Sequence, residues 1–214
     1  LRTDGLRVIE KARTLELRPA QVFARPEEIG PVDVVLVALK TTGNAELSRL
    51  LPPLVGPDTL VVTLQNGLGN EEYLAGLVGP DRVLGGICFV ASTRTGPGEV
   101  TCYHPGAITL GEHGRPAAER TRALAAAFTA AGVKCTAVEN LAEARWRKLV
   151  WNVPFNGLAI VAGGITTDRI LADPTLAAEV RALMDEIAAG AAKLGYGIQE
   201  SFIQRQLDST PPMG

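Results

Sequence analysis

Apolar and polar positions along the chain follow two successive patterns. In the first part, short apolar runs rich in β-branched residues alternate with stretches of helical spacing, and in the second part only helical spacing remains. The run from Val32 to Leu39 is almost continuously apolar, which is typical of a parallel strand covered on both faces. The predicted order is strand 32–39, helix 44–51, strand 59–64, helix 70–79 and strand 82–92, and Asn70 is expected to cap the second helix. This alternation predicts an open α/β sheet.

Shorter strands flank this central region. Residues 6–9 and 14–17 predict a small two-stranded ribbon, and residues 99–104 and 107–111 predict a hairpin around Pro105-Gly106. An amphipathic helix over 116–131, ended by Gly132, precedes a last strand at 134–138 that completes the first domain.

The rest of the chain is predicted to be helical. Asn140, with Glu143 three residues later, is a typical start for a helix from Leu141. Asp173-Pro174 predicts the start of another helix, which ends at Gly195. We place the domain boundary between residues 1–139 and residues 140–214. The apolar stripe from Leu176 to Leu194 is compatible with a homodimer interface, although such stripes more often pack into the core of their own domain.

Composition narrows the function classes. A net charge of −2 and a pI near 5.8 argue against nucleic acid as a main partner. The three scattered cysteines and two histidines predict no metal site and indicate a reducing compartment. The longest apolar run, Leu158 to Ile165, is far shorter than the roughly 18 residues of a membrane helix. With no signal peptide, we expect a cytoplasmic protein. The ends at Leu1 and Met213-Gly214 suggest a longer parent protein.

Two polar signals follow predicted strands of the sheet. Lys40 comes directly after the first strand, and Gln65-Asn66-Gly67 follows the second, at the edge where ligands of open α/β sheets bind. The alternative is a solvated lysine and a plain turn. Gly67-Leu68-Gly69 does not make a dinucleotide fingerprint, because Glu72 stands where the third glycine is needed. A dinucleotide would therefore need a phosphate loop from an N-terminal segment outside the chain.

A second polar group lies on the helix that starts at Leu141. Lys148, Asn152 and Asn156 are spaced i, i+4 and i+8, so they share one face of an otherwise apolar helix. Pro154 removes a backbone hydrogen bond and predicts a kink. Such a face suits a substrate pocket, and the alternative is a snorkelling lysine with two structural asparagines.

Three motifs resemble the ketopantoate reductase family. The segment Ala142 to Asn152, with Asn156 after it, is similar to the family's WRKL signature, which is followed by asparagines at four and eight residues. Val35 to Lys40 resembles the strand that ends in a lysine near the cofactor. Leu64 to Glu72 resembles the QNGLGNEE segment. The motifs occur in the family's order, and the resemblance covers most of the chain.

The resemblance implies an incomplete Rossmann-like domain followed by a helical domain, with the active site in the cleft between them. It implies reduction of 2-dehydropantoate to pantoate with NADPH, on the pathway to pantothenate and coenzyme A. The site residues it implies are Lys148 as proton donor, Asn152 and Asn156 as substrate ligands, Asn66 between nicotinamide and substrate, Lys40 near the cofactor, and Ala91 or Ser92 along the cofactor wall. An ammonium beside a ketone that accepts hydride stabilises the growing charge on oxygen and supplies the proton.

The chain departs from the family pattern at several points. The phosphate-binding glycines, the residues that select NADP over NAD, and a late serine and glutamate are absent. Thr166-Thr167-Asp168 replaces a PNGEL-like turn, and Thr167 is the expected substrate contact there. Two alternatives stay open: a reductase of another 2-oxoacid on the same frame, and a cofactor-binding fragment without turnover.

Overall fold

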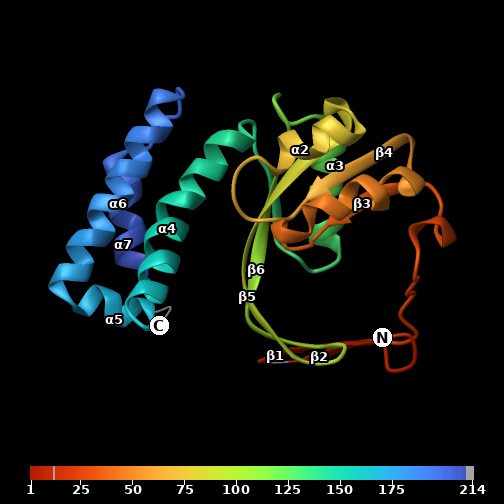
Figure 1. The fold of residues 1–214 in the computed structure, drawn as a ribbon, viewed down its shortest axis with the longest axis horizontal. Coiled ribbons are helices and arrows are strands. Elements are labelled where there is room, and N and C mark those ends of the chain that lie inside the picture. The colour runs from red at the N-terminus through yellow and green to blue at the C-terminus, as the bar shows by residue number, and fades with distance from the viewer. Residues whose placement is uncertain (12, 211–214) are drawn as a thin grey trace. The chain divides into compact units, whose positions relative to one another are not determined.

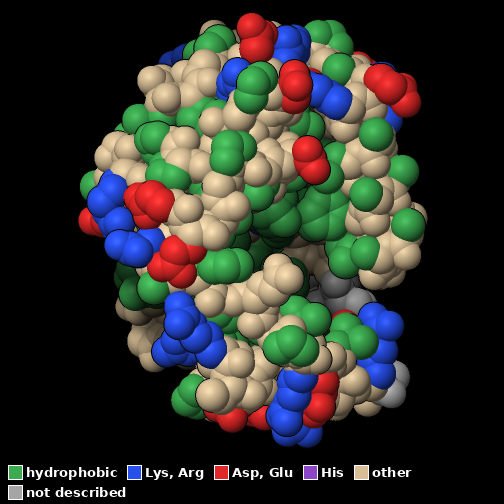
Figure 2. Space-filling model, turned by 90° about the vertical axis from the view of Figure 1, so that its right-hand side faces the viewer, with side chains coloured by type: hydrophobic (Ala, Val, Ile, Leu, Met, Phe, Trp, Pro, Cys, Tyr) green, Lys and Arg blue, Asp and Glu red, His purple; other side chains and the backbone are tan. Residues whose placement is uncertain are grey.

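The computed structural model describes residues 1–11 and 13–210, so the Met213-Gly214 end lies outside the described residues. The chain separates into two compact units, Leu1–Leu141 and Ala142–Gly214, which Figure 1 shows as a sheet-containing part and a helical part. No helix in the described ranges is long and apolar enough to cross a membrane. Basic and acidic side chains are interspersed on the face shown in Figure 2.

The first unit contains one mixed sheet in the order β2-β1-β6-β5-β4-β3, with β7 paired to β6. Its strands are β1 (Leu6–Glu10), β2 (Thr14–Leu17), β3 (Val32–Val37), β4 (Val55–Thr63), β5 (Val83–Gly96), β6 (Glu99–Glu112) and β7 (Cys135–Ala137). Its helices are η1 (Pro26–Glu28), η2 (Thr41–Glu46), α1 (Leu47–Leu50), η3 (Pro52–Leu54), α2 (Asn70–Val78), η4 (Pro80–Arg82) and α3 (Glu119–Ala130). β3, β4 and β5 run parallel, which confirms the predicted α/β core.

Both faces of β4 and β5 are buried where these strands pair. β3, at the edge of the sheet, leaves Leu36 46% exposed, so the expectation of a strand covered on both faces is wrong there. Val61 and Val83 point to one face, where they pack with Leu74 of α2 and with α1. Val62 and Leu84, the next residues along, point to the other face and pack with Ala125 of α3. Because side chains alternate along a strand, both sets must be apolar, which produces the continuous apolar runs in the sequence.

The predicted hairpin around Pro105-Gly106 is wrong. β6 runs unbroken from Glu99 to Glu112 and pairs antiparallel with β5, and both strands sweep from the core sheet to the β1–β2 ribbon (Figure 1). Phe89 pairs with Ala107 and Ala91 with His104, so one residue of β5 opposes two of β6. Gly106 has φ 75°, and a Cβ there would lie 2.5 Å from the Phe89 carbonyl oxygen. The turn-like dipeptide therefore forms a β-bulge.

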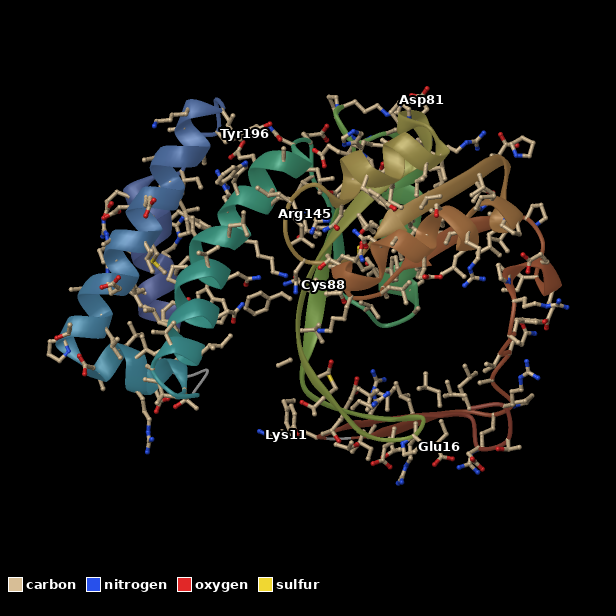
Figure 3. The ribbon with its side chains drawn as sticks, viewed as in Figure 1. Lys11, Glu16, Asp81, Cys88, Arg145 and Tyr196 are labelled. Atoms are coloured by element: carbon tan, nitrogen blue, oxygen red, sulfur yellow. The ribbon has the colours of Figure 1, made fainter. Side chains whose placement is uncertain are left out.

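The helix predicted over 44–51 is also different in detail. The segment forms the 3-10 helix η2 and then the single α-helical turn α1, before Pro52 and Pro53 end it. The ribbon predicted at the start is confirmed, because β1 and β2 pair antiparallel, with Arg7 opposite Glu16. Figure 3 labels Glu16 on this ribbon.

The second unit consists of α4 (Leu141–Val161), α5 (Thr167–Ala172), α6 (Pro174–Lys193) and α7 (Glu200–Ser209). Its core joins all four helices through Val150, Phe155, Ile170, Val180, Met184 and Ile203. The predicted start of α6 is confirmed, since the Asp173 carboxylate accepts from the Thr175 and Leu176 backbone N–H groups. Gly195, with φ 86°, follows its end as predicted.

A buried carboxylate ties the end of β6 to neighbouring elements. Glu112 is 1% exposed and accepts hydrogen bonds from Arg115, Arg120 and Thr121. Arg115 also donates to Asp81 of η4 at 2.8 Å (Asp81 is labelled in Figure 3). Burial by itself raises the pKa of Glu112, but the hydrogen bonds from Arg120 and Thr121 and the charge of Arg120 outweigh it, so this pKa lies below its ordinary value.

Replacing Glu112 with glutamine should reduce the free energy of unfolding by about 2 kcal/mol at neutral pH, because charge-assisted hydrogen bonds are lost. Because the pKa of Glu112 is lowered in the folded protein, its contribution is complete above its ordinary pKa near 4.5 and is lost as the pH falls through the folded value. Urea unfolding of both proteins across this range should show the difference shrinking on acidification. The exposed Glu186→Gln is the matched control. A difference that does not change with pH would contradict the role of the charge.

Candidate functional site

The carboxyl ends of β3 and β4 carry two exposed polar side chains. Lys40 follows β3 and precedes η2, and Asn66 follows β4. Val37 and Thr63, the last residues of these strands, are paired in the parallel register, so both loops leave the same edge of the sheet. The Leu64 backbone N–H donates to the Val37 carbonyl at 2.9 Å, which holds the loops together. The structure therefore brings the segments of Lys40 and Asn66 to one edge, where ligands of open α/β sheets bind.

The loop between Asn66 and α2 differs from the prediction. We expected Asn70 to cap α2, but Gly69 holds the N-cap position with φ 86° and gives no side-chain bond. The Asn70 side chain instead donates to the Asn66 carbonyl at 3.0 Å. Glu71 and Glu72 occupy the first turn of α2, so two acidic residues stand where a phosphate-binding helix would present only N–H groups.

Ala91 and Ser92 lie on β5, away from the ends of the parallel strands. Both are exposed, and their partners are residues of β6. Gly85 is the last β5 residue that pairs with β4. Ala91 lies six residues beyond it, which is roughly 20 Å along an extended strand. The structure thus places these two residues on the extension of β5 toward the ribbon.

In the second unit, α4 presents the lysine and the asparagines. Lys148 and Asn152 are half-buried and Asn156 is exposed. The opposite side of the helix is fixed by the core, where Val150 is fully buried. Because that side is anchored, the direction of the Lys148 face within this unit is set by packing rather than by the polar residues themselves.

One side-chain hydrogen bond and one internal proline further characterise α4. The Trp151 indole N–H donates to the Thr210 hydroxyl at 2.9 Å, which fastens α4 to the end of α7. Pro154 lies inside the helix, which continues to Val161. The kink expected at this proline stays a prediction.

Thr167 lies in the first turn of α5, after the glycines at 163 and 164, both with positive φ. Its hydroxyl oxygen is buried, and within the described ranges it has no hydrogen-bond partner. A hydrogen bond from the Thr166 hydroxyl lowers the pKa of the neighbouring Asp168 carboxyl. Thr167 therefore keeps a hydrogen-bonding capacity that a ligand or a water molecule can satisfy.

Two family models match the chain. "Ketopantoate reductase PanE/ApbA" matches residues 1–115, and "Ketopantoate reductase PanE/ApbA C terminal" matches residues 140–211. The chain belongs to the ketopantoate reductase family. The family consists of oxidoreductases, and the expectation of a Rossmann-like sheet domain followed by a helical domain is confirmed.

Relatives agree with this membership. The chain is 40% identical to the 2-dehydropantoate 2-reductase of Nostoc sp., over 98% of this chain and 67% of that protein. It is similar to the crystal structure of 2-dehydropantoate 2-reductase from Geobacter metallireducens, with a TM-score of 0.96 and 42% identity over all of this chain and 71% of that one. It is also similar to the crystal structure of 2-dehydropantoate 2-reductase from Methylococcus capsulatus, with a TM-score of 0.89 and 36% identity over all of this chain and 69% of that one. The chain thus spans about two thirds of these relatives.

Arg145 is a candidate site residue that the sequence analysis did not identify. It lies three residues before Lys148 and seven before Asn152, so all three share one face of α4. Arg145 is only 4% exposed, which is rare for a guanidinium (Figure 3 labels it on α4). The signal for Arg145 in the sequence is its spacing, because a residue three positions before Lys148 lies on the same helical face.

Proposed function

We propose that the protein reduces 2-dehydropantoate to pantoate with NADPH, with Lys148 as the proton donor. The observation that carries this proposal is the half-buried Lys148 on the same face of α4 as Asn152 and Asn156, in a chain that belongs to the ketopantoate reductase family. The names of the similar Nostoc and Geobacter proteins support the substrate.

The residues present fit the nicotinamide part of a dinucleotide. Lys40 supplies an exposed cation and Asn66 an exposed amide at the carboxyl edge of adjacent parallel strands. We assign both to cofactor binding, with Ala91 and Ser92 along the cofactor wall. The acidic first turn of α2 has no phosphate-binding role in this proposal.

The proposed chemistry is a balanced two-electron reduction. When bound, NADPH would supply the hydride that the carbonyl carbon of the oxoacid accepts. The Lys148 ammonium donates its proton to the carbonyl oxygen as negative charge develops there, and the neutral amine then regains a proton from water. Asn152 and Asn156 hold the hydroxyl and carboxylate end of the substrate through paired donors and acceptors. Thr167, whose buried hydroxyl has no hydrogen-bond partner among residues 1–11 and 13–210, is a further substrate contact.

The direct test follows NADPH oxidation by absorbance with a panel of 2-oxoacids. We expect the highest kcat/KM with 2-dehydropantoate, and a higher kcat/KM with NADPH than with NADH. A clear preference for another oxoacid would favour the alternative, to which the replaced turn at Thr166 to Asp168 also points. Cofactor binding without turnover on any oxoacid would rule out the reductase function. A cytoplasmic location and a homodimer belong to the same proposal.

Replacing Asn152 with alanine should mainly raise the KM for the oxoacid, by about 10-fold, since one or two hydrogen bonds to bound substrate are lost. Steady-state kinetics at saturating NADPH measures this change. Gln21→Ala, which removes an exposed carboxamide in the first unit, provides the control. An unchanged KM with normal kcat would argue against a substrate role for Asn152.

A further inference from the structure

Three carboxamide side chains link the two loops at the edge of the sheet. The Gln65 amide nitrogen donates to the Leu39 carbonyl and to the Asn44 side-chain oxygen, both at 2.8 Å. The Asn44 amide nitrogen donates to the Asn70 side-chain oxygen at 3.2 Å. The Asn70 amide nitrogen then donates to the Asn66 carbonyl at 3.0 Å. The chain of bonds therefore runs from the residue before Lys40 to Asn66 itself.

Burial makes this arrangement specific. Gln65 is 5% exposed and Asn70 3% exposed, and the Gln65 side-chain oxygen accepts from the Thr63 hydroxyl at 3.1 Å. Each amide uses its oxygen as an acceptor and its nitrogen as a donor, so the bonds point in one direction. A carboxylate has nearly the same shape as a carboxamide but has no N–H donor. Its oxygen would face the acceptor oxygen that the amide nitrogen now binds.

We propose that Gln65, Asn44 and Asn70 are positioning residues for the reduction, which hold Asn66 and the loop of Lys40 in their working geometry. This inference rests on the proposed function. The Asn66 carbonyl is fixed by Asn70, and the chain turns at once at Gly67, with φ 95°, so the orientation of the Asn66 peptide is fixed while its side chain stays exposed. The Leu39 carbonyl, held by Gln65, gives the same anchor on the side of Lys40.

The physical reason for such a device is the sensitivity of hydride transfer to placement. A displacement of about 1 Å in a reacting or binding group can lower a rate roughly 100-fold. Loops tolerate displacements of that size unless side chains hold them. Satisfied buried polar networks give rigidity and a unique geometry, because every alternative leaves a buried group without a partner.

The test uses substitutions of nearly identical shape, Asn70→Asp and Gln65→Glu, in the purified protein with NADPH and 2-dehydropantoate. We expect kcat/KM to fall about 10- to 100-fold for each. Gln21→Glu, an exposed position in the same unit, makes the same chemical change and should stay within about twofold of the parent. If Gln65→Glu does not fold, Asn44→Asp, at a half-buried position, replaces it.

The deciding measurement is a double-mutant comparison with Asn66→Ala. If Asn70 acts through Asn66, Asn70→Asp should cost less than about twofold in the Asn66→Ala background, because the group it positions is gone. A merely structural role would give losses that multiply. Multiplying losses, or near-parental kcat/KM in Asn70→Asp and Gln65→Glu, overturn the positioning role while the proposed function stands. If the parent protein fails to oxidise NADPH with any of the 2-oxoacids, the proposed function is overturned, and the positioning role is overturned with it.

Discussion

Replacing Lys148 with alanine is expected to lower kcat for 2-dehydropantoate reduction about 10²- to 10⁴-fold, the usual contribution of a positioned general acid. Hydride addition places a negative charge on the carbonyl oxygen, and the ammonium is the only group in the proposed mechanism that both stabilises this charge and supplies a proton. Cofactor binding should be unchanged, since Lys40 and Asn66, which we assign to the cofactor, remain. Stopped-flow or steady-state NADPH oxidation measures the first effect, and NADPH fluorescence titration the second.

Two further variants separate charge from proton supply at this position. Lys148→Arg keeps the positive charge, but a guanidinium releases a proton poorly because its pKa is above about 12. It should therefore recover substrate binding but little turnover. Lys193→Ala, at an exposed lysine on α6, should behave like the parent. Turnover of Lys148→Ala within twofold of the parent would exclude Lys148 as the acid.

Replacing Phe155 with alanine should reduce the free energy of unfolding by about 3–5 kcal/mol, through lost burial and the cavity left behind. Phe155 is 1% exposed, and its ring centroid lies 5.1 Å from that of Trp151. It packs in the cluster that joins all four helices of the second unit. Urea unfolding followed by tryptophan fluorescence measures the change, because Trp151 reports directly on this contact.

The neighbouring Val153 gives the matched control for Phe155. It lies two residues away on the same helix but is 45% exposed. Val153→Ala should therefore change the free energy of unfolding by less than about 1 kcal/mol. Equal losses in the two variants would show that the Phe155 effect does not come from core packing, because alanine has the higher helix propensity in both cases.

The sequence predicted those features that depend on local pattern. The apolar run after Pro31 gave β3, and Asp173-Pro174 gave the start of α6, because strand burial and helix capping both leave signals within a few residues. The face of Lys148, Asn152 and Asn156 follows from helical spacing alone. Their roles in the reaction are still predictions.

The errors arose where a local signal has two structural meanings. Pro105-Gly106 is a common turn sequence, but a positive φ at Gly106 serves a β-bulge equally well, and the long partner strand β5 decided between them. Asn70 is a typical cap, yet its side chain is used by Asn44 and Asn66 instead. The chain of amides joins Gln65 to Asn44, 21 residues earlier, and no spacing rule connects such positions.

The pairing of β1 with β6 also constrains how the first unit acquires its structure. Arg7 is paired with Glu99, so the two strands are joined only after a segment of 92 residues has been synthesised. Contacts this distant along the chain close late, because the entropy of the intervening loop opposes them. A two-stranded ribbon is at best marginally stable alone. The β1–β2 ribbon, although synthesised before β6, is therefore expected to be among the last parts of this unit to become ordered.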